Sequence, residues 1–303
     1  MMIQTENLTK RFDEQVAVES LTLEIAAGEV FGFLGPNGAG KTTTVRMLTC
    51  LIAPSAGRAV VAGCRLGEED REIRRNVGIL TETPGLYERL SAERNLVIFA
   101  HLYEVEDVAG QVEKYLRMLG LWSRRQDPAG TFSKGMKQKL AIARSLLHEP
   151  RLLFLDEPTA GLDPEASRLV RDFVTELKEQ GRTIFLTTHN LDEAERLCDR
   201  IGVINTHLLV VDTPAELRRQ LFGRQVVFHL GNDPDGFLSM VQEMSAVRHA
   251  QTRDNKLVLA LEDPEADNPE IVRRLAAAGA EIQFVGELKH SLEDVYLQLV
   301  QTE

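Results

Sequence analysis

The chain has 303 residues, of which 43% are hydrophobic and 27% are charged, and its 35 basic and 46 acidic residues give a formal net charge of −11. This acidic balance argues against a protein that coats DNA or RNA, because such binding neutralises phosphates with a basic face. No stretch approaches the roughly 20 apolar residues of a membrane-spanning helix, and no basic-then-apolar signal segment is present at the start. We therefore expect a globular chain in the cytoplasm with no nucleic-acid partner, built as one large domain with an appendage or as two domains.

Up to about residue 220, short apolar runs alternate with longer helical patterns, which is typical of a parallel sheet covered by helices. Residues 21–25 alternate like a half-buried strand, whereas three nearly continuous apolar runs predict strands covered on both faces. These runs are residues 30–34, 152–155 and 183–187. Between about residues 85 and 150 the pattern is helical, which predicts a helical subdomain inserted into the α/β domain.

After Pro214 the pattern predicts strands at 226–230, 246–251, 257–261 and 281–285, with helices at 237–244 and 271–278. The order β-α-β-β-α-β is the split motif of ferredoxin-like domains. We interpret residues 263–268 as an acidic loop and expect a last helix from Ser291. The predicted domains are therefore 1–222, of α/β class, and 223–303, a small α+β domain.

The segment GPNGAGKT at residues 35–42 fits the phosphate-binding pattern G-x-x-x-x-G-K-[ST] and stands between a predicted strand and a helical pattern, as that motif requires. Glycines let successive backbone N–H groups converge on an anion, and the helix N-terminus adds partial positive charge. In such loops the lysine, here Lys41, reaches the β- and γ-phosphates, and the hydroxyl, here that of Thr42, ligates Mg²⁺. The residues expected to bind the nucleotide are Gly35, Pro36, Asn37, Gly38, Ala39, Gly40, Lys41, Thr42 and Thr43.

A carboxylate pair follows the apolar run at 152–155. Asp156 stands at the polar end of the predicted strand, where it can hold Mg²⁺ opposite Thr42. Glu157 follows on the other face of the chain, in a place suited to a base that polarises an attacking water. Such a pair alone often begins a solvated turn, but downstream of a phosphate-binding loop it indicates nucleotide hydrolysis.

Three further segments resemble those of ABC ATP-binding proteins. Residues 132–138, FSKGMKQ, are similar to the family's signature segment, and residues 156–163, DEPTAGLD, to its Walker B segment and D-loop. Residues 187–189, TTH, are similar to its switch-histidine segment. Because the order and spacing match over about residues 1–220, the chain is identified as a member of this family. The resemblance implies a P-loop NTPase ABC cassette with an inserted helical subdomain, and an ATPase that uses ATP and Mg²⁺.

The resemblance also implies roles for single residues. Phe12 is expected to stack on adenine, with a plain core residue as the alternative. Ser133 and Gly135 are expected to face the γ-phosphate bound in a second protomer, since a helix N-terminus attracts an anion. His189 is expected to contact the γ-phosphate as a catalytic residue beside Glu157 and Lys41. With Asp163 at the dimer seam, the active form is expected to be a homodimer or a pair of ATPase subunits.

Two departures from the common family pattern point to one branch. Glu82 stands where glutamine is usual, and its carboxylate is expected to ligate Mg²⁺ or orient water. The signature reads FSKGM rather than LSGGQ. Together with residues 290–297, HSLEDVYL, these features resemble the ABC-2 type drug and antibiotic exporters of the daunorubicin-resistance type. That branch implies separate membrane-spanning permease subunits that dock near residues 84–90, and a chain peripheral on the inner face of the cell membrane.

Two other functions are compatible with parts of the sequence. One is a soluble ABC ATPase that acts on ribosomes or nucleic acid, and the other is a nucleotide-dependent binding module without hydrolysis. The single cassette and the acidic balance argue against the first, and the intact Lys41, Asp156, Glu157 and His189 argue against the second. The C-terminal domain is open to three roles, namely dimerisation or regulation, bracing of the cassette, and ligand sensing.

Overall fold

The computed structural model describes residues 1–81, 83–288 and 290–301. The chain divides into two compact units, Met1–Thr213 and Pro214–Glu303. The sequence predicted a boundary after residue 222. In the structure the boundary lies after Thr213, so helix α8 (Pro214–Phe222) belongs to the second unit and not to the first. Within the described residues no helix is both long enough and apolar enough to cross a lipid bilayer.

A six-stranded sheet forms the centre of the first unit, in the order β10-β9-β3-β8-β7-β6. The strands are β3 (Val30–Leu34), β6 (Val77–Leu80), β7 (Leu152–Asp156), β8 (Thr183–Thr188), β9 (Arg200–Asn205) and β10 (His207–Asp212). All residues of β3, β7 and β8 are buried, as their continuous apolar runs predicted. From β9 to β6 the strands pair in parallel, so their carboxyl ends meet at one edge of the sheet.

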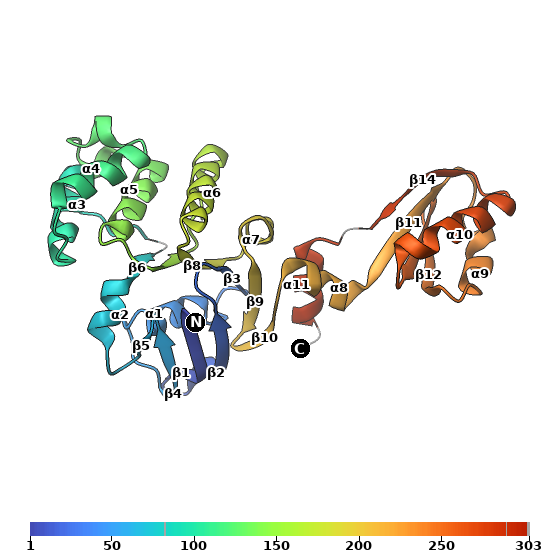
Figure 1. The fold of residues 1–303 in the computed structure, drawn as a ribbon, viewed down its shortest axis with the longest axis horizontal. Coiled ribbons are helices and arrows are strands. Elements are labelled where there is room, and N and C mark those ends of the chain that lie inside the picture. The colour runs from blue at the N-terminus through green and yellow to red at the C-terminus, as the bar shows by residue number, and fades with distance from the viewer. Residues whose placement is uncertain (82, 289, 302–303) are drawn as a thin grey trace. The chain divides into compact units, whose positions relative to one another are not determined.

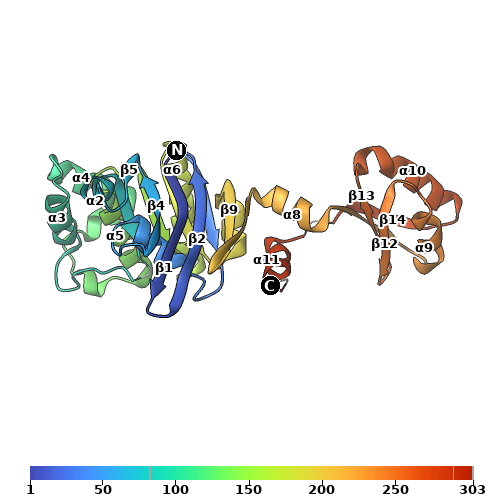
Figure 2. The ribbon, with the colours of Figure 1, turned by 90° about the horizontal axis from the view of Figure 1, so that it is seen from below.

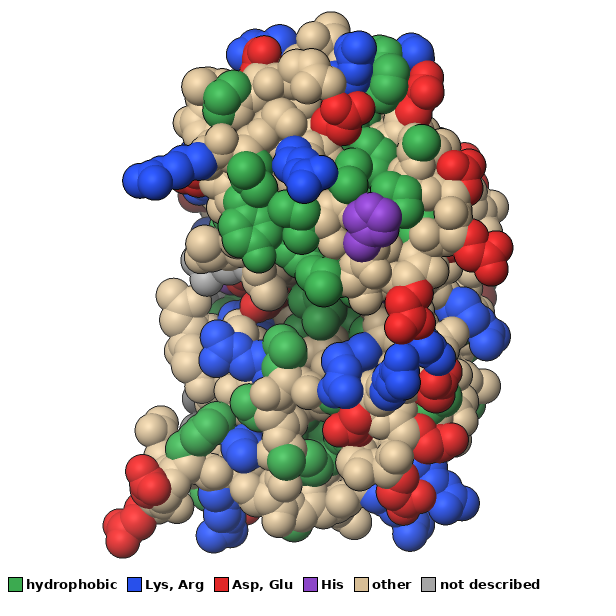
Figure 3. Space-filling model, turned by 90° about the vertical axis from the view of Figure 1, so that its left-hand side faces the viewer, with side chains coloured by type: hydrophobic (Ala, Val, Ile, Leu, Met, Phe, Trp, Pro, Cys, Tyr) green, Lys and Arg blue, Asp and Glu red, His purple; other side chains and the backbone are tan. Residues whose placement is uncertain are grey.

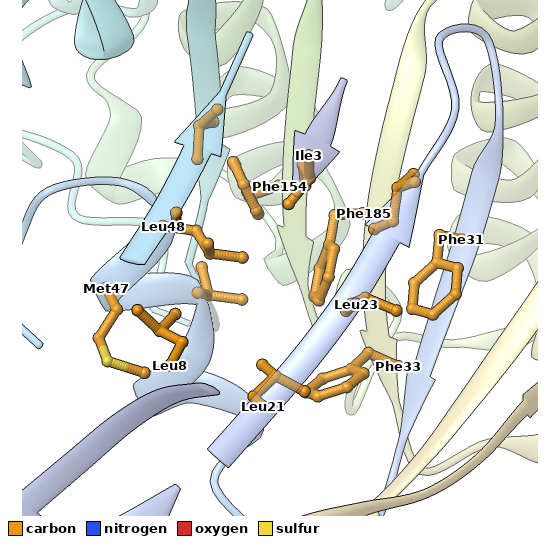
Figure 4. Close-up of a cluster of buried hydrophobic side chains, with 14 of the residues drawn as sticks. Ile3, Leu8, Leu21, Leu23, Phe31, Phe33, Met47, Leu48, Phe154 and Phe185 are labelled. Carbon is orange, nitrogen blue, oxygen red and sulfur yellow. The ribbon is translucent and has the colours of Figure 1, made fainter. Parts of the chain in front are cut away.

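A second, antiparallel sheet pairs in the order β2-β1-β4-β5, where β1 is Ile3–Phe12, β2 is Gln15–Ile25, β4 is Ala56–Val61 and β5 is Cys64–Arg65. One hydrophobic cluster joins the two sheets and helix α1 (Figure 4). Phe33 and Phe154 lie on either side of Phe185, with ring centroids 5.2 and 5.4 Å from it. Close packing of this cluster fixes the strands whose ends carry the polar residues discussed below.

The helices of the first unit are α1 (Lys41–Leu48), α2 (Asp70–Asn76), α3 (Ala92–Leu102), α4 (Val108–Met118), α5 (Lys134–Leu146), α6 (Pro164–Glu179) and α7 (Leu191–Leu197). Two short 3-10 helices, Trp122–Arg124 and Ala129–Thr131, link α4 to α5. Helices α3, α4 and α5 pack on one another as the predicted helical subdomain, drawn in green in Figure 1. The buried amide of Asn95 holds the loop before α3, because it accepts from the backbone N–H of Tyr87 and donates to three carbonyls of residues 87–91.

The second unit contains a four-stranded antiparallel sheet in the order β12-β13-β11-β14. Its further elements are β11 (Arg224–Leu230), α9 (Asp235–Gln242), β12 (Val247–Arg253), β13 (Lys256–Leu261), α10 (Pro264–Ala277), β14 (Ile282–Glu287) and α11 (Leu292–Gln301). Helices α9 and α10 cover one face of this sheet (Figure 2), and their apolar side chains share a core with alternate residues of the strands. This order and pairing confirm the ferredoxin-like domain, and the fold class is as predicted from the sequence.

One element of this unit was predicted wrongly. Residues 263–268 were expected to form an acidic loop, whereas they form the start of α10. The Asp263 side chain accepts a hydrogen bond from the Ala266 N–H and caps the helix, and Pro264 occupies the first turn, where its missing N–H costs nothing. An acidic residue followed by proline therefore marked a helix start rather than a loop.

Candidate nucleotide site

The segment between β3 and α1 curls at the carboxyl edge of the central sheet. Gly40 caps α1 with φ 98°, a left-handed conformation that glycine adopts without strain. A Cβ atom at Gly40 would also overlap the carbonyl oxygen of Ala17 on β2. The sequence therefore places glycine where the backbone must turn sharply and pass close to another strand, which leaves the N-terminus of α1 facing the cavity.

Lys41 is the first residue of α1, and its side chain folds back over this loop. Its ammonium donates to the carbonyl oxygens of Gly35 at 2.7 Å and Pro36 at 3.1 Å, and Oε1 of Glu157 lies 4.0 Å away. Burial lowers the pKa of Lys41, against the opposing effect of the Glu157 and Asp156 carboxylates. A buried ammonium held by neutral carbonyls is well placed to exchange those partners for a phosphate.

Asp156 ends β7 and is 96% buried, since its relative exposure is 4%. Its carboxylate accepts from the Thr42 hydroxyl at 3.1 Å and from the Thr187 hydroxyl. The structure thus brings Thr42 and Asp156 together across 114 residues of sequence, as the sequence predicted for a pair that shares one cation.

Glu157 turns away from the strand with φ 51°, an unusual conformation for a residue other than glycine. The turn is held by its backbone N–H, which donates to the carbonyl of Thr187 at 3.0 Å. One carboxylate oxygen lies 2.8 Å from Nδ1 of His189, whose side chain is 65% exposed, whereas that of Glu157 is only 14% exposed. The strained turn therefore aims the Glu157 carboxylate between a lysine and a histidine, a cost that is typical of functional sites.

Lys41, Glu157 and His189 line one cavity of about 270 Å³. Its walls are Pro36, Asn37, Gly38, Gly40, Lys41, Thr42, Thr43, Glu157, Ala160 and His189. Residues from the phosphate-binding loop, from the loop after β7 and from the end of β8 thus meet at the edge where the parallel strands end, which is where ligands bind in such sheets.

Four candidate residues, Phe12, Ser133, Gly135 and Asp163, do not line this cavity. Phe12 ends β1 with 47% exposure, and the Lys10 ammonium lies 5.0 Å from the centroid of its ring. Ser133 caps α5 by accepting from the Met136 N–H, and Asp163 caps α6 by accepting from the Ala166 N–H at 2.8 Å. Gly135 packs against α6, since a Cβ there would lie 2.9 Å from the Cβ of Ala166. The expected role of Glu82 falls outside the described residues.

Two residues at this edge were missed by the sequence analysis. Thr187 is fully buried and supplies the second hydroxyl to Asp156. Glu193, 2% exposed in the first turn of α7, accepts hydrogen bonds from Thr159 at 3.0 Å and Thr188 at 3.2 Å, and burial raises its pKa. The signal for Glu193 was its place three residues after the capping residue Asn190, in a sequence otherwise typical of an exposed helix start.

The donor set fits a nucleoside triphosphate with a divalent cation. Backbone N–H groups at a helix N-terminus and a lysine suit phosphates, and the oxygens of Thr42 and Asp156 are of the kind that Mg²⁺ prefers. Among the described residues no group of three or more His, Cys, Asp or Glu side chains is gathered as in an all-protein metal site. Mg²⁺ needs no such group, because it retains water and phosphate ligands.

Comparison with known proteins agrees with this geometry. The ABC transporter family matches residues 18–160, and the C-terminal domain of DrrA1-3-like ATP-binding proteins matches residues 213–300. A solved structure of an ATP-binding subunit of an ABC transporter is 32% identical, with a TM-score of 0.68, and the match covers 80% of this chain and 100% of that one.

Two relatives match almost throughout. The bacitracin transport ATP-binding protein BcrA of Bacillus licheniformis is 33% identical over 300 residues, which is 99% of this chain and 97% of the relative. The Nod factor export ATP-binding protein I of Rhizobium sp. (strain N33) is 34% identical over 304 residues, again 99% and 97%.

The chain therefore belongs to the ABC transporter family, as a subunit that binds and hydrolyses ATP. Within that family it belongs to the exporter branch whose ATP-binding proteins carry a DrrA1-3-like C-terminal domain. Both predictions made from the sequence are confirmed, and the alternative of an ATPase acting on ribosomes or nucleic acid is not favoured.

Proposed function

We propose that this chain hydrolyses ATP at the edge of its central sheet and so powers export through separate membrane-spanning subunits. The observation that carries the proposal is the carboxylate of Glu157, which stands 2.8 Å from His189 and 4.0 Å from Lys41 in a cavity lined by the phosphate-binding loop. A base beside the expected γ-phosphate, flanked by a cation and an imidazole, is the arrangement that phosphoryl transfer to water requires.

In this proposal the side chains of the site divide the chemistry among them. Residues 35–43 hold the triphosphate, and the Lys41 ammonium neutralises charge on the β- and γ-phosphates. Glu157 orients the attacking water and accepts its proton, while His189 positions the Glu157 carboxylate and contacts the γ-phosphate. Phe12 stacks on adenine. Thr42 and Asp156, with Glu82 as a further expected ligand, would hold Mg²⁺, which would supply positive charge against that developing on the phosphate oxygens.

The complete site takes groups from two chains. Ser133, Gly135 and Asp163 lie outside the cavity of their own chain but cap or begin helices at exposed ends. We assign Ser133 and Gly135 to the γ-phosphate of a partner cassette and Asp163 to the seam between the two. ATP then joins the cassettes, whether identical or paired, and hydrolysis releases them.

The permease subunits are proposed to dock on the helical subdomain, close to residues 84–90. Hydrophobic side chains gather in the upper half of this face and are bordered by charges (Figure 3). Leu102 is 68% exposed and Tyr87 51% exposed, and Tyr87 stacks on Phe99 at 6.1 Å. An apolar centre with a polar rim is the usual composition of a protein interface. The chain would thus be peripheral on the cytoplasmic face of the membrane, with no nucleic-acid partner.

The transported compound is proposed to be a product exported from the cell, by analogy with the bacitracin transport and Nod factor export relatives. The membrane subunits, rather than this chain, select it. The C-terminal domain is proposed to support dimerisation or regulation of the cassettes.

The test uses tagged full-length chain with Glu157→Gln, which keeps the shape of the side chain but removes the base. We expect this variant to bind ATP like the wild type and to turn over at least about 100-fold more slowly. Held with ATP and Mg²⁺ in membranes of its native host, it should retain a polytopic membrane protein in ATP-dependent amounts. Equal turnover would remove Glu157 from the catalytic role, and capture of ribosomes or nucleic acid alone would refute the transporter assignment.

A further inference from the structure

The first turns of α5 lie along the loop that follows Glu157 in the same chain. The Gln138 amide, buried to 5% exposure, donates to the carbonyl of Pro158 at 2.8 Å. Gly135 faces Ala166 so closely that a Cβ at residue 135 would lie 2.9 Å from the Cβ of Ala166. Positions 135 and 138 are neighbours on one helix face, so this face of the signature segment packs against residues 158–166.

Lys134, the first residue of α5, makes a third contact with this loop. A Cβ atom on Gly161 would overlap Nζ of Lys134 and lie 3.7 Å from its Cε. Gly161 has φ 64°, a left-handed conformation that glycine adopts without strain, and it carries no side chain. The lysine ammonium therefore occupies the space that the missing side chain of Gly161 leaves free.

The helix itself gives no reason for a lysine at this position. A cation at a helix N-terminus opposes the helix dipole, and the first turn of α5 contains no acidic residue to compensate. Lys137, one turn further on, is paired with Glu88 at 2.6 Å. The placement of Lys134 is thus unfavourable for α5 alone.

Gly161 is one residue from the wall of the nucleotide cavity. Ala160 lines that cavity, and its backbone N–H donates to the carbonyl of Glu157 at 3.1 Å. A short hydrogen-bonded turn thus connects the base to the residue on which the Lys134 ammonium rests. A displacement of Gly161 would be transmitted to the direction of the Glu157 carboxylate.

We propose that Lys134 is a positioning residue: its ammonium rests on Gly161 and thereby couples the signature segment to the Glu157 loop of the same chain. Because the signature segment is assigned to the ATP of the partner cassette, this contact links ATP at one site to the base of the other. The inference rests on the proposed function, since it needs hydrolysis at Glu157 and a composite site.

The test is a double-mutant cycle in the full-length chain, with steady-state ATP hydrolysis as the readout. Lys134→Ala removes the ammonium, and Gly161→Ala places a methyl group in the space that the ammonium occupies. Each change is expected to lower kcat about 3- to 30-fold with KM for ATP changed less than about twofold, and the double variant should be no slower than the slower single variant, since contacting residues are coupled.

Two control variants separate this contact from general effects. Gly181→Ala introduces the same strain at φ 76° in open space, and Lys139→Ala removes another α5 lysine. Both should keep the wild-type kcat. The melting temperature of Lys134→Ala should equal or slightly exceed that of the wild type, because a charge opposed to the helix dipole is removed; a merely structural contact would lower it.

The outcomes distinguish this inference from the function on which it rests. Absence of hydrolysis by the wild-type chain would refute the proposed function and this inference with it. A hydrolysing wild type with unchanged Lys134→Ala kinetics, or with effects that multiply in the double variant, would overturn the coupling alone. A raised KM with unchanged kcat would also overturn it, since Lys134 would then bind phosphate directly.

Discussion

The carboxylate of Asp156 is buried with two threonine hydroxyls as hydrogen-bond donors, and only one of these was expected from the sequence. Thr187 faces Asp156 because the two residues are register partners on the parallel strands β7 and β8. A buried carboxylate that loses a donor is left with part of its desolvation uncompensated. Thr187 should therefore hold Asp156 in the orientation that places it beside Thr42.

Thr187→Val, which replaces the hydroxyl with a methyl group of similar size, should lower the free energy of unfolding by about 2 kcal/mol. It should also raise the Mg²⁺ concentration needed for half-maximal ATP hydrolysis, because Asp156 is less well oriented. Denaturant unfolding and a Mg²⁺ titration measure the two effects. Thr187→Ser, which keeps the hydroxyl, is the control; a Mg²⁺ dependence shifted equally in both variants would contradict the role of the hydroxyl.

His148 predicts a pH dependence of stability. Its ring is stacked on Tyr103 at 4.1 Å, and Nε2 donates to the carbonyl of Val77, while Nδ1 is buried without a partner among the described residues. Burial, with a smaller contribution from Arg182, lowers the pKa of His148, against the backbone hydrogen bond and Glu149. Below the ordinary histidine pKa of 6.5, His148 is protonated in the unfolded chain but remains largely neutral in the folded chain. The free energy of unfolding therefore decreases as the pH falls.

The free energy of unfolding should change by at most about 1.4 kcal/mol per pH unit through this single proton. His148→Phe keeps the stacked ring but cannot titrate, so its unfolding free energy should be lower than that of the wild type at pH 7.5 and should approach it at pH 5.5. Denaturant unfolding at the two pH values measures the difference. A constant difference between wild type and variant would show that His148 does not titrate in this range.

At the scale of elements, the residue that precedes α6 also has a role between cassettes in the proposed function. Asp163 caps this helix, and the 16-residue α6 buries Val170 and Phe173 in the first unit. Asp163→Ala should lower the free energy of unfolding by about 1 kcal/mol, as the loss of a cap usually does. Asp163→Asn keeps a capping oxygen and should retain wild-type stability.

The same two variants distinguish the role of Asp163 as a helix cap from its proposed role between the two cassettes. If the Asp163 charge acts between cassettes, Asp163→Asn should lower ATP turnover although its unfolding curve is that of the wild type. Wild-type turnover in Asp163→Asn, with a loss only in Asp163→Ala, would assign the residue to helix capping alone.

The elements also explain how far the sequence could be interpreted. The strands β3, β7 and β8 were predictable because strands buried on both faces are continuously apolar. β1 was not predicted, since several shifts in its register with β2 and β4 break the alternation of buried and exposed residues. The start of α10 was missed because the acidic stretch at 263–268 was interpreted as a loop, although a capping aspartate followed by proline is typical of a helix start.

The site residues that could be predicted belong to local motifs, whereas hydrogen bonds between side chains far apart in the sequence were not predicted. The phosphate-binding loop and Asp156-Glu157 were recognisable from adjacent residues, and the structure brings both to one cavity edge. The bonds from Thr187 to Asp156 and from Thr159 to Glu193 join residues 31 and 34 positions apart. Such pairs depend on which strands are neighbours in the sheet, and hydrophobic periodicity does not contain that information.

At the scale of the whole molecule, a composite site makes two inactive variants complementary. Lys41→Ala removes the lysine of a chain's own phosphate-binding loop, and Ser133→Arg places a large side chain at the helix start assigned to the partner's ATP. A dimer of either variant contains no intact site. A mixed dimer contains one, because the chain with Ser133→Arg contributes its phosphate-binding loop and the chain with Lys41→Ala contributes its signature segment.

Equal mixing should therefore restore hydrolysis to about a quarter of the wild-type rate if the two sites act independently, since half of the dimers are mixed and each has one of two sites. A much lower rate, with mixed dimers demonstrated by differently tagged chains, would mean that hydrolysis requires both sites together. Removal of Mg²⁺ with a chelator should abolish the restored activity. If Ser133→Arg alone hydrolysed ATP normally, the site would lie within one chain, and neither the shared ATP nor the coupling through Lys134 would hold.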